Sequence, residues 1–119
     1  MVKKISTEQA RINRKIAERK RWLLIHEPIC IFCLKPIYGN GDPCHKIRKS
    51  YASSYHTREE LHTMPLNIGL GHRDCHIIFD DKPAQARLLP GISKVLSDIE
   101  KIDVDYYKRI VDKYLSIVC

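Results

Sequence analysis

The sequence predicts a single α+β domain in which a small ββα unit lies between N- and C-terminal helices. Helical periodicity is strongest at the two ends of the chain, strand and turn signals gather in the middle, and two short Cys and His pairs bracket that middle. A chain of 119 residues suits one compact domain with a modest core. The domain accordingly divides into a helix over residues 1–28, the ββα unit over residues 29–82 and a helical segment over residues 83–119.

The first segment has the pattern of a basic helix. Ser6 can cap this helix with Gln9 reaching back, and Pro28 stops it. Eight Lys and Arg residues and only two acids precede residue 27, in a chain whose net charge is +7. This excess predicts a polyanionic partner, with nucleic acid before an anionic membrane surface, although a solvated helix face would have the same composition. The side chains expected to hold the nucleic-acid backbone are Arg14, Lys15, Arg19 and Lys20.

The middle segment begins with a predicted hairpin. Asn40 and Gly41 are a strong signal for a type I′ turn, because both of its central positions need a positive φ. A strand over about residues 43–47 follows, and a second short apolar strand ends where His72 begins the next motif. The residues after Cys75 can start a helix, which completes the order ββα.

Two pairs of metal-binding residue types flank a gap of 38 residues in this segment. Cys30 and Cys33 have the separation of a knuckle, a tight turn whose thiolates converge on one tetrahedral ion. His72 and Cys75 repeat that separation. Together they predict a structural Cys3His zinc site that staples the ββα unit. In the alternative interpretation the two cysteines of the knuckle are buried small hydrophobes and His72 is a surface residue.

The last segment again has helical spacing, with Asp103 or Asp105 at the start of a helix. Its apolar face is interpreted as core or as a partner contact, and comprises Tyr107, Ile110, Val111, Tyr114, Leu115 and Val118. Trp22 and Tyr106 are assigned to the core as well. His26 is expected to cap a helix end, and His56 and His62 are expected on the surface.

The cellular compartment, and with it the redox state of the cysteines, is predicted from the lack of a membrane span and of a secretory signal. The sequence has no run of eighteen apolar residues, and its N-terminus is charged where a secretory signal needs an apolar core. These features predict a cytoplasmic protein without a membrane span. In a reducing compartment, five cysteines are expected to be thiols or metal ligands, and Cys119 a free thiol.

With this element order and these spacings, residues 29–82 resemble the HNH (His-Me finger) endonucleases, in the version whose ββα-metal motif is braced by a structural zinc. The resemblance implies that His45, in the stretch CHKI, is the general base. It implies that Asn67, nine residues before His76, supports the orientation of that base. It further implies that His76 and Asp80, four residues apart on one helix face, hold a catalytic divalent ion such as Mg²⁺.

One position departs from the family pattern. The residue before the base is normally a metal ligand, and here it is Cys44, a soft thiol poorly suited to Mg²⁺. Three arrangements remain open: His76 and Asp80 hold the ion with waters and substrate, Asp42 reaches in, or the ion is a softer one such as Mn²⁺, Ni²⁺ or Zn²⁺.

The sequence therefore favours a metal-dependent endonuclease that hydrolyses phosphodiester bonds of DNA, with RNA also open. Arg48 and Lys49 directly follow the base and are expected to meet the phosphates of the scissile strand. One alternative is a zinc-braced nucleic-acid-binding protein without catalysis, which Cys44 favours. The other is an interaction protein that forms a homodimer through its terminal helices.

Overall fold

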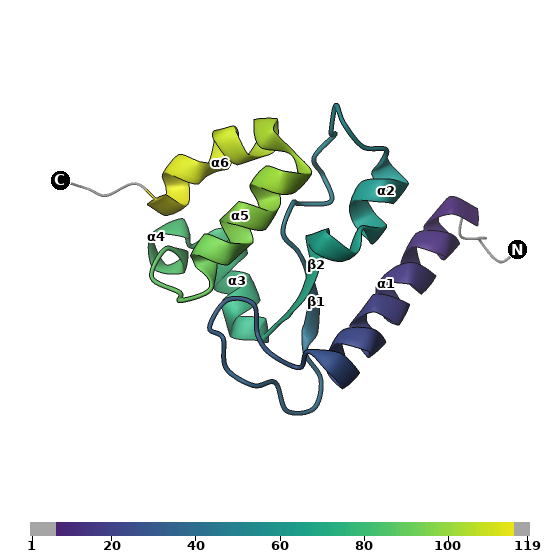
Figure 1. Cartoon of the computed structure of the whole chain (residues 1–119), viewed down its shortest axis with the longest axis horizontal. Coiled ribbons are helices and arrows are strands. Elements are labelled where there is room, and N and C mark those ends of the chain that lie inside the picture. Colours follow the sequence, from purple (N-terminus) through teal and green to yellow (C-terminus); the bar gives the residue numbers. More distant parts are fainter. Residues whose placement is uncertain (1–6, 116–119) are drawn as a thin grey trace, which may run out of the picture.

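The computed structural model describes residues 7–115 of the chain. Helices surround one small sheet, so the fold is mixed helix with a two-stranded sheet, as the α+β prediction requires (Figure 1). The elements in chain order are α1 (Thr7–His26), β1 (Asp42–His45), α2 (Arg58–Thr63), the 3-10 helix η1 (Pro65–Asn67), β2 (Ile68–Gly71), α3 (Arg73–Asp81), α4 (Pro83–Ala86), α5 (Ile92–Ile102) and α6 (Val104–Leu115).

The two strands pair antiparallel, with Asp42 opposite Gly71 and His45 opposite Ile68. The predicted type I′ turn is wrong: the positive φ of this loop, 79°, belongs to Gly39, and the residues before it do not pair with β1. All four residues of β2 are buried, so pairing with β2 brings β1 into the core. The connection between the strands carries α2 and η1 instead of a tight hairpin.

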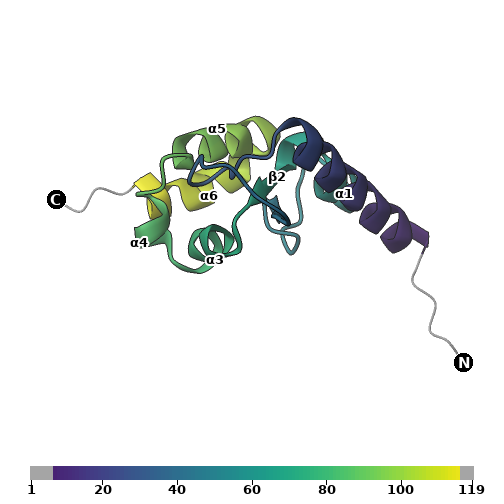
Figure 2. The ribbon, with the colours of Figure 1, turned by 90° about the horizontal axis from the view of Figure 1, so that it is seen from below.

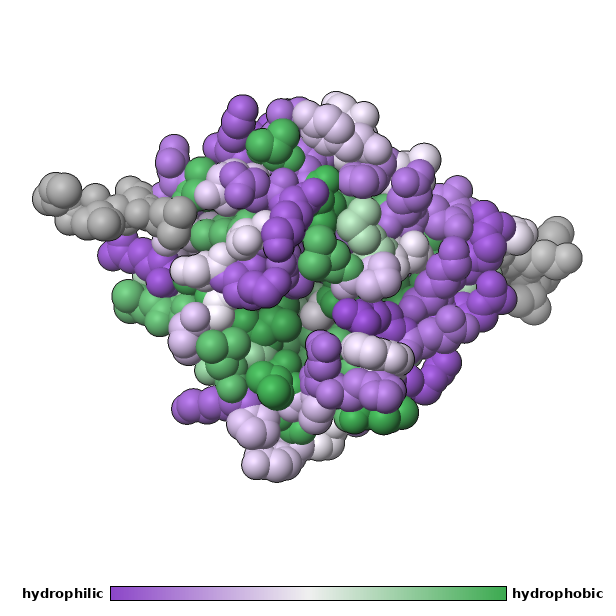
Figure 3. Space-filling model, in the orientation of Figure 1, coloured by the Kyte–Doolittle hydropathy of each residue, from purple (hydrophilic) through white to green (hydrophobic). Residues whose placement is uncertain are grey.

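The helix α1 lies along one side of the sheet, on the side away from α6 (Figures 1 and 2). Ile12 and Leu23 are buried on its inner face, and hydrophilic side chains cover much of its outer face (Figure 3). The helix ends at His26, two residues before Pro28, and the predicted Ser6 cap lies outside the described residues. The assignment of Trp22 to the core is wrong, because the ring is 43% exposed.

The C-terminal segment consists of α4, α5 and α6. α5 carries an unpredicted core face, comprising Ile92, Val95, Leu96, Ile99 and Ile102. Asp103 lies just before α6 and accepts a hydrogen bond from the Tyr106 backbone N–H at 3.0 Å, which confirms it as the helix cap. Tyr106 and Tyr114 are buried, whereas Val118 and Cys119 lie outside the described residues.

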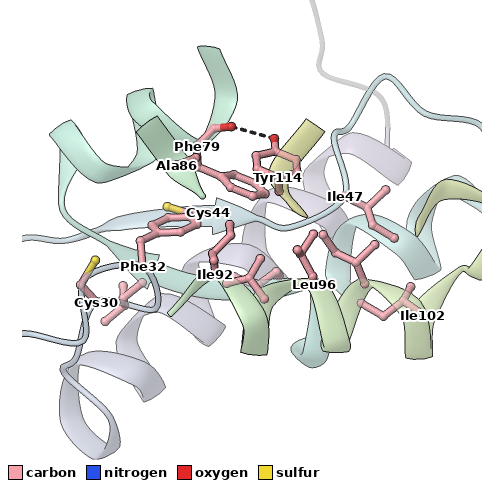
Figure 4. Close-up of a cluster of buried hydrophobic side chains, with 14 of the residues drawn as sticks. Cys30, Phe32, Cys44, Ile47, Phe79, Ala86, Ile92, Leu96, Ile102 and Tyr114 are labelled. Carbon is pink, nitrogen blue, oxygen red and sulfur yellow. Dashed lines mark hydrogen bonds between the residues drawn. The ribbon is translucent and has the colours of Figure 1, made fainter. Parts of the chain in front are cut away.

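Aromatic side chains join the loop after α1 to α3 and α6 in the core (Figure 4). The Phe32 and Phe79 rings stack at 4.9 Å, and the Phe79 and Tyr114 rings at 5.3 Å. Gly91, just before α5, docks on the same loop, and its backbone N–H donates to the Phe32 carbonyl at 2.7 Å. A Cβ at Gly91 would lie 1.9 Å from the Ile31 carbonyl oxygen, so no larger residue fits there.

A buried ion pair connects the segment after β1 to α5. The Lys46 ammonium lies 2.7 Å from the Asp98 carboxylate and also donates to the Leu66 carbonyl at 2.8 Å. Burial lowers the pKa of Lys46, and the Asp98 carboxylate opposes that change. Breaking such a pair by removing one partner leaves an uncompensated buried charge. None of the described helices has the length and apolar character that crossing a membrane requires.

Candidate metal centre and the adjoining pocket

Four predicted zinc ligands converge. The ligand atoms of the Cys3His group (Cys30, Cys33, His72 and Cys75) lie within 4.8 Å of one another. The ligand atoms around a tetrahedral zinc stand about 3.8 Å apart when the bonds are about 2.3 Å, so small movements complete the geometry. The group could therefore hold a structural metal such as zinc, with all four positions filled by the protein.

The knuckle has a specific backbone shape. The Leu34 N–H donates to the Cys30 carbonyl at 2.9 Å, and Leu34 itself has a left-handed φ of 63°. The N–H groups of Cys33 and His72 both approach the Cys30 sulfur at 3.5 Å. Burial raises the pKa of Cys30, but these backbone donors outweigh it and lower the pKa to about 7. The fold therefore favours a thiolate, the form that binds metal, at Cys30.

The tautomer of His72 is fixed by a hydrogen bond on its far side. The His72 Nε2 lies 3.2 Å from the Pro36 carbonyl oxygen, which can only accept, so Nε2 carries the proton. The other nitrogen, Nδ1, lies 3.2 Å from the Cys33 sulfur, inside the Cys3His group. This is the usual arrangement of a metal-binding histidine, with one nitrogen held by a carbonyl and the other left for the ion.

A pocket of about 360 Å³ opens beside this centre and collects most of the residues that the resemblance singles out. We call it the His45 pocket. His45 comes from β1, Arg48 and Lys49 from the segment that follows, and His76 and Asp80 from α3. Its full lining is Pro43, His45, Arg48, Lys49, His76, Asp80 and Asp81.

The orientation of His45 leaves one ring nitrogen free of a proton. Its Nε2 lies 2.8 Å from the His62 carbonyl oxygen, so Nε2 is the donor and Nδ1 of the neutral ring is an acceptor. Burial lowers the pKa of His45 to about 4, and the nearby Lys49 charge acts in the same direction. The ring is therefore neutral near pH 7 and able to accept a proton.

Asn67 holds both segments that orient His45. It is fully buried, its Oδ1 accepts from the Ile47 N–H at 2.8 Å, and its Nδ2 donates to the Leu61 carbonyl at 2.8 Å. Ile47 lies two residues after His45, and Leu61 directly precedes the residue whose carbonyl binds that ring. The side chain of Asn67 thus joins the segment after His45 to the segment whose carbonyl binds the His45 ring.

His62 is a residue that the sequence analysis missed. It was expected on the surface, but it is only 3% exposed, and its Nε2 lies 3.0 Å from the Lys49 carbonyl oxygen. Its ring meets the His45 ring edge-on at 5.9 Å. The adjacent Leu61, an apolar residue on the same short helix, is the one signal in the sequence that α2 packs inward here.

His76 and Asp80 are in direct contact on α3. The His76 Nε2 lies 3.1 Å from Asp80 Oδ2, close to the separation of about 3.0 Å between neighbouring ligand atoms of an octahedral ion. On the other side, the His76 Nδ1 lies 3.7 Å from Asp42 Oδ2. Within residues 7–115 these three do not form a converging group of the kind that the Cys3His residues form. The helix begins at Arg73, earlier than expected, so both residues lie within it.

Cys44 does not line the His45 pocket. Its side chain is fully buried in the core, and its sulfur lies 3.3 Å from the Asp42 carbonyl oxygen. Burial raises the pKa of the Cys44 thiol, so it stays protonated. A buried, protonated thiol that points into the core is not a ligand for an ion in the pocket.

Three of the six Lys and Arg residues of α1 lie within ion-pair distance of a carboxylate. Arg11 and Lys15 both contact the Glu59 carboxylate of α2, at 2.8 Å and 3.4 Å, and Arg14 lies 4.0 Å from Glu18. Arg19 covers the Trp22 ring at 4.8 Å. By contrast, Arg48 and Lys49 line the His45 pocket, where the Arg48 guanidinium donates to the Asp80 carbonyl.

Comparison of the chain with protein-family models, with curated proteins and with solved structures finds no match. The geometry of the Cys3His group and of the His45 pocket is therefore the basis on which a function can be assigned.

Proposed function

We propose that the chain is a metal-dependent endonuclease of the HNH type that hydrolyses DNA phosphodiester bonds. One observation carries this proposal. The neutral His45 ring, with its Nδ1 free to accept a proton, shares a pocket with the contacting His76 and Asp80 and with two cationic side chains. A base, a site for a divalent ion and cations for phosphates are the parts that phosphodiester hydrolysis requires.

His45 is proposed to take a proton from the attacking water through Nδ1. The hydrogen bond from Nε2 to the His62 carbonyl holds the ring while the proton arrives. A pKa of about 4 makes the ring a weak base in the free protein. A phosphodiester bound beside Arg48 and Lys49 adds a negative charge near the ring, which acts to raise this pKa, whereas the divalent ion acts to lower it.

His76 and Asp80 are proposed to hold the divalent ion, with Asp42 as the nearest further carboxylate. Such an ion supplies positive charge beside the phosphoryl oxygens and the departing oxygen. Asn67 and the Cys3His group are proposed to have a positioning role. Asn67 holds the segments around His45, and His72 and Cys75 fix the start of α3, about two turns before Asp80.

A second candidate function, binding of nucleic acid without cleavage, has its own support. Cys44 occupies the position that carries a metal ligand in the family that the chain resembles, and its thiol is buried and protonated. Two candidate ligands, His76 and Asp80, are then in contact, and the Asp42 carboxylate lies 3.7 Å from the other nitrogen of His76, which is a sparse set for a hard ion. A protein of this kind would keep the cationic side chains that bind phosphates and would not catalyse cleavage.

A cleavage assay separates the two candidates. The purified chain is incubated with supercoiled plasmid, single-stranded DNA, a branched DNA junction and duplex RNA, each with Mg²⁺, Mn²⁺, Ni²⁺ or Zn²⁺, or with no added ion. Ion-dependent nicking of DNA is the result that the proposal expects. Binding to DNA without cleavage under every condition would support the second candidate. A chain that neither binds nor cuts would instead suit an interaction protein.

Replacing the base gives the specific test. His45→Ala should lower cleavage by about 100- to 10,000-fold, because general-base catalysis contributes that much, while DNA binding and metal content stay unchanged. His26→Ala is the matched control, since His26 is exposed at the end of α1 and contacts Trp22. Equal cleavage by His45→Ala and His26→Ala would overturn the assigned role.

A further inference from the structure

A second groove continues from the His45 pocket towards the C-terminal helix. Arg48 lines both hollows, and the second, of about 240 Å³, is otherwise formed by Tyr51 and by residues of α6. We call it the α6 groove. Its cationic members are Arg48, Arg109 and Lys113. The sequence predicts phosphate contacts by Arg48 and Lys49 and by α1, and α1 lies on the opposite side of the molecule from α6 (Figure 1).

Among the described residues, the cations of the α6 groove have no acidic partner. Within residues 7–115, no carboxylate lies within ion-pair distance of Arg109 or Lys113. Asp105, one turn before Arg109, accepts instead a hydrogen bond from the Tyr55 hydroxyl at 3.1 Å. The contrast with α1 is direct, because Arg11 and Lys15 share Glu59 there.

The groove also holds its cations in position. The Arg109 guanidinium lies 5.6 Å from the centre of the Tyr51 ring, and the Tyr51 hydroxyl is anchored on the Asp103 carboxylate at 3.3 Å. Lys113 follows Arg109 by four residues, so both side chains lie on one face of α6, about 6 Å apart along its axis.

We propose that the α6 groove binds the phosphate backbone of the strand whose scissile phosphate enters the His45 pocket, a proposal that rests on the nuclease function above. Arg48 bridges the two hollows, and Arg109 and Lys113 contact the next phosphates along the strand. The Tyr51 ring is covered by a guanidinium, so it is not free to stack on bases. Recognition in the groove therefore reads the backbone and carries little base specificity.

Binding measurements on full-length variants test the proposal. The double variant Arg109→Gln and Lys113→Gln is compared with the double variant Lys101→Gln and Lys108→Gln, which removes the same charge from exposed positions of α5 and α6 outside the groove. Affinity for duplex DNA and duplex RNA is measured by fluorescence anisotropy at several salt concentrations, with no added divalent ion. Each lost phosphate contact lowers the salt slope by about 0.9, so the groove variant should lower it by about 1.8.

The groove variant should bind about ten-fold more weakly at 50 mM salt than the parent, whereas the control pair stays within about two-fold. If the double variant folds poorly, Lys113→Glu alone is measured instead. It should also weaken DNA binding, and it leaves the Arg109 contact with Tyr51 intact. Equal affinities and slopes for the groove and control variants would overturn the proposal, and so would RNA binding by the parent without DNA binding.

The two proposals can fail separately. If the parent binds DNA through the groove but never cleaves it, the nuclease function fails and the groove remains as a backbone-binding surface. If the parent cleaves and the groove variant cleaves and binds as the parent does, the groove assignment fails and the nuclease function stands.

Discussion

The helix α3 contributes residues to two neighbouring sites, one closed and one open. Cys75 belongs to the Cys3His group, and the next residue, His76, lines the His45 pocket. Adjacent residues on a helix are separated by about 100° of rotation, so they face different surroundings. In the first site four side chains converge that could all bind one ion, whereas in the second His76 and Asp80 contact each other beside open space. The closed site suits a structural ion, and the open site leaves room for water and substrate.

The largest expected effect concerns the closed site. Cys33→Ser should lose the metal and the cooperatively folded state, because a structural zinc contributes on the order of 10 kcal/mol to folding in small zinc domains. Metal analysis and thermal unfolding check both outcomes. Cys44→Ala is the matched control: it should retain about one zinc per chain and cost about 1–2 kcal/mol of stability through lost packing. A parent without zinc, or a Cys33→Ser variant as stable as the parent, would show that the group is no metal site.

A substitution in the open site, the His45 pocket, should lower the cleavage activity and leave the fold intact. Asp80→Ala should lower cleavage by about 100-fold with Mg²⁺, since it removes one of two contacting ligands of the proposed ion, and the melting temperature should change little. Raising Mn²⁺ should restore part of the cleavage, whereas it should not restore His45→Ala.

Asp81→Ala is the control for the open site. Asp81 also lines the His45 pocket, yet it has no contact with His76. The Asp81→Ala variant should cleave DNA at a rate within a few-fold of the parent's rate. Similar losses in the two variants would mean that the general negative charge of the pocket, and not ligation by Asp80, is what matters.

Replacing Asn67 should lower both the stability and the cleavage activity. Asn67→Ala leaves the Ile47 N–H and the Leu61 carbonyl without their partner in the core, which should cost about 2–4 kcal/mol of stability in urea unfolding. Cleavage should fall further than stability explains, because His45 loses the support of both segments. Asn40→Ala, at an exposed loop position, should change neither property. An Asn67→Ala protein with full stability would contradict the role of these two hydrogen bonds.

The smallest expected effect is a pH dependence. The folded pKa of His45, about 4, lies below its unfolded value of about 6.5, so the unfolded chain binds more protons between these values. The stability contributed by neutral His45 is therefore fully present above about pH 6.5 and is lost as the pH falls towards 4. Urea unfolding of zinc-loaded parent and His45→Gln proteins at pH 7.0, 6.0 and 5.0 should show a steeper decline for the parent. Parallel declines would mean that the burial of His45 has no such cost.

Spacing within short motifs predicted a large part of the candidate site. The two Cys and His pairs, the contact between His76 and Asp80, and the helix cap at Asp103 all follow from local geometry, because turns and helices fix the distance between residues two to four apart. The end of α1 before Pro28 follows from local chemistry in the same way.

The features that the sequence did not predict depend on distant partners. Asn40 and Gly41 suit a tight turn, but β1 pairs with β2 instead, more than twenty residues later. His62 is a polar residue of a type usually found at the surface, and its burial depends on the Lys49 carbonyl, which accepts a hydrogen bond from its Nε2. Local composition does not record such partners, and it equally hides the burial of Cys44.

The ion pair of Lys46 with Asp98 has a consequence for how the chain folds. These two residues are 52 positions apart, and Asp103 binds Tyr51 and Ser53 over similar separations. Contacts between distant positions make folding slow, because a long loop must close before any of them forms. Residues 29–82 also lack the two carboxylates, Asp98 and Asp103, that bind Lys46 and Ser53, so we expect this segment alone to remain unfolded. Trp22 fluorescence, which reports on α1, should follow the same single unfolding transition as far-ultraviolet circular dichroism.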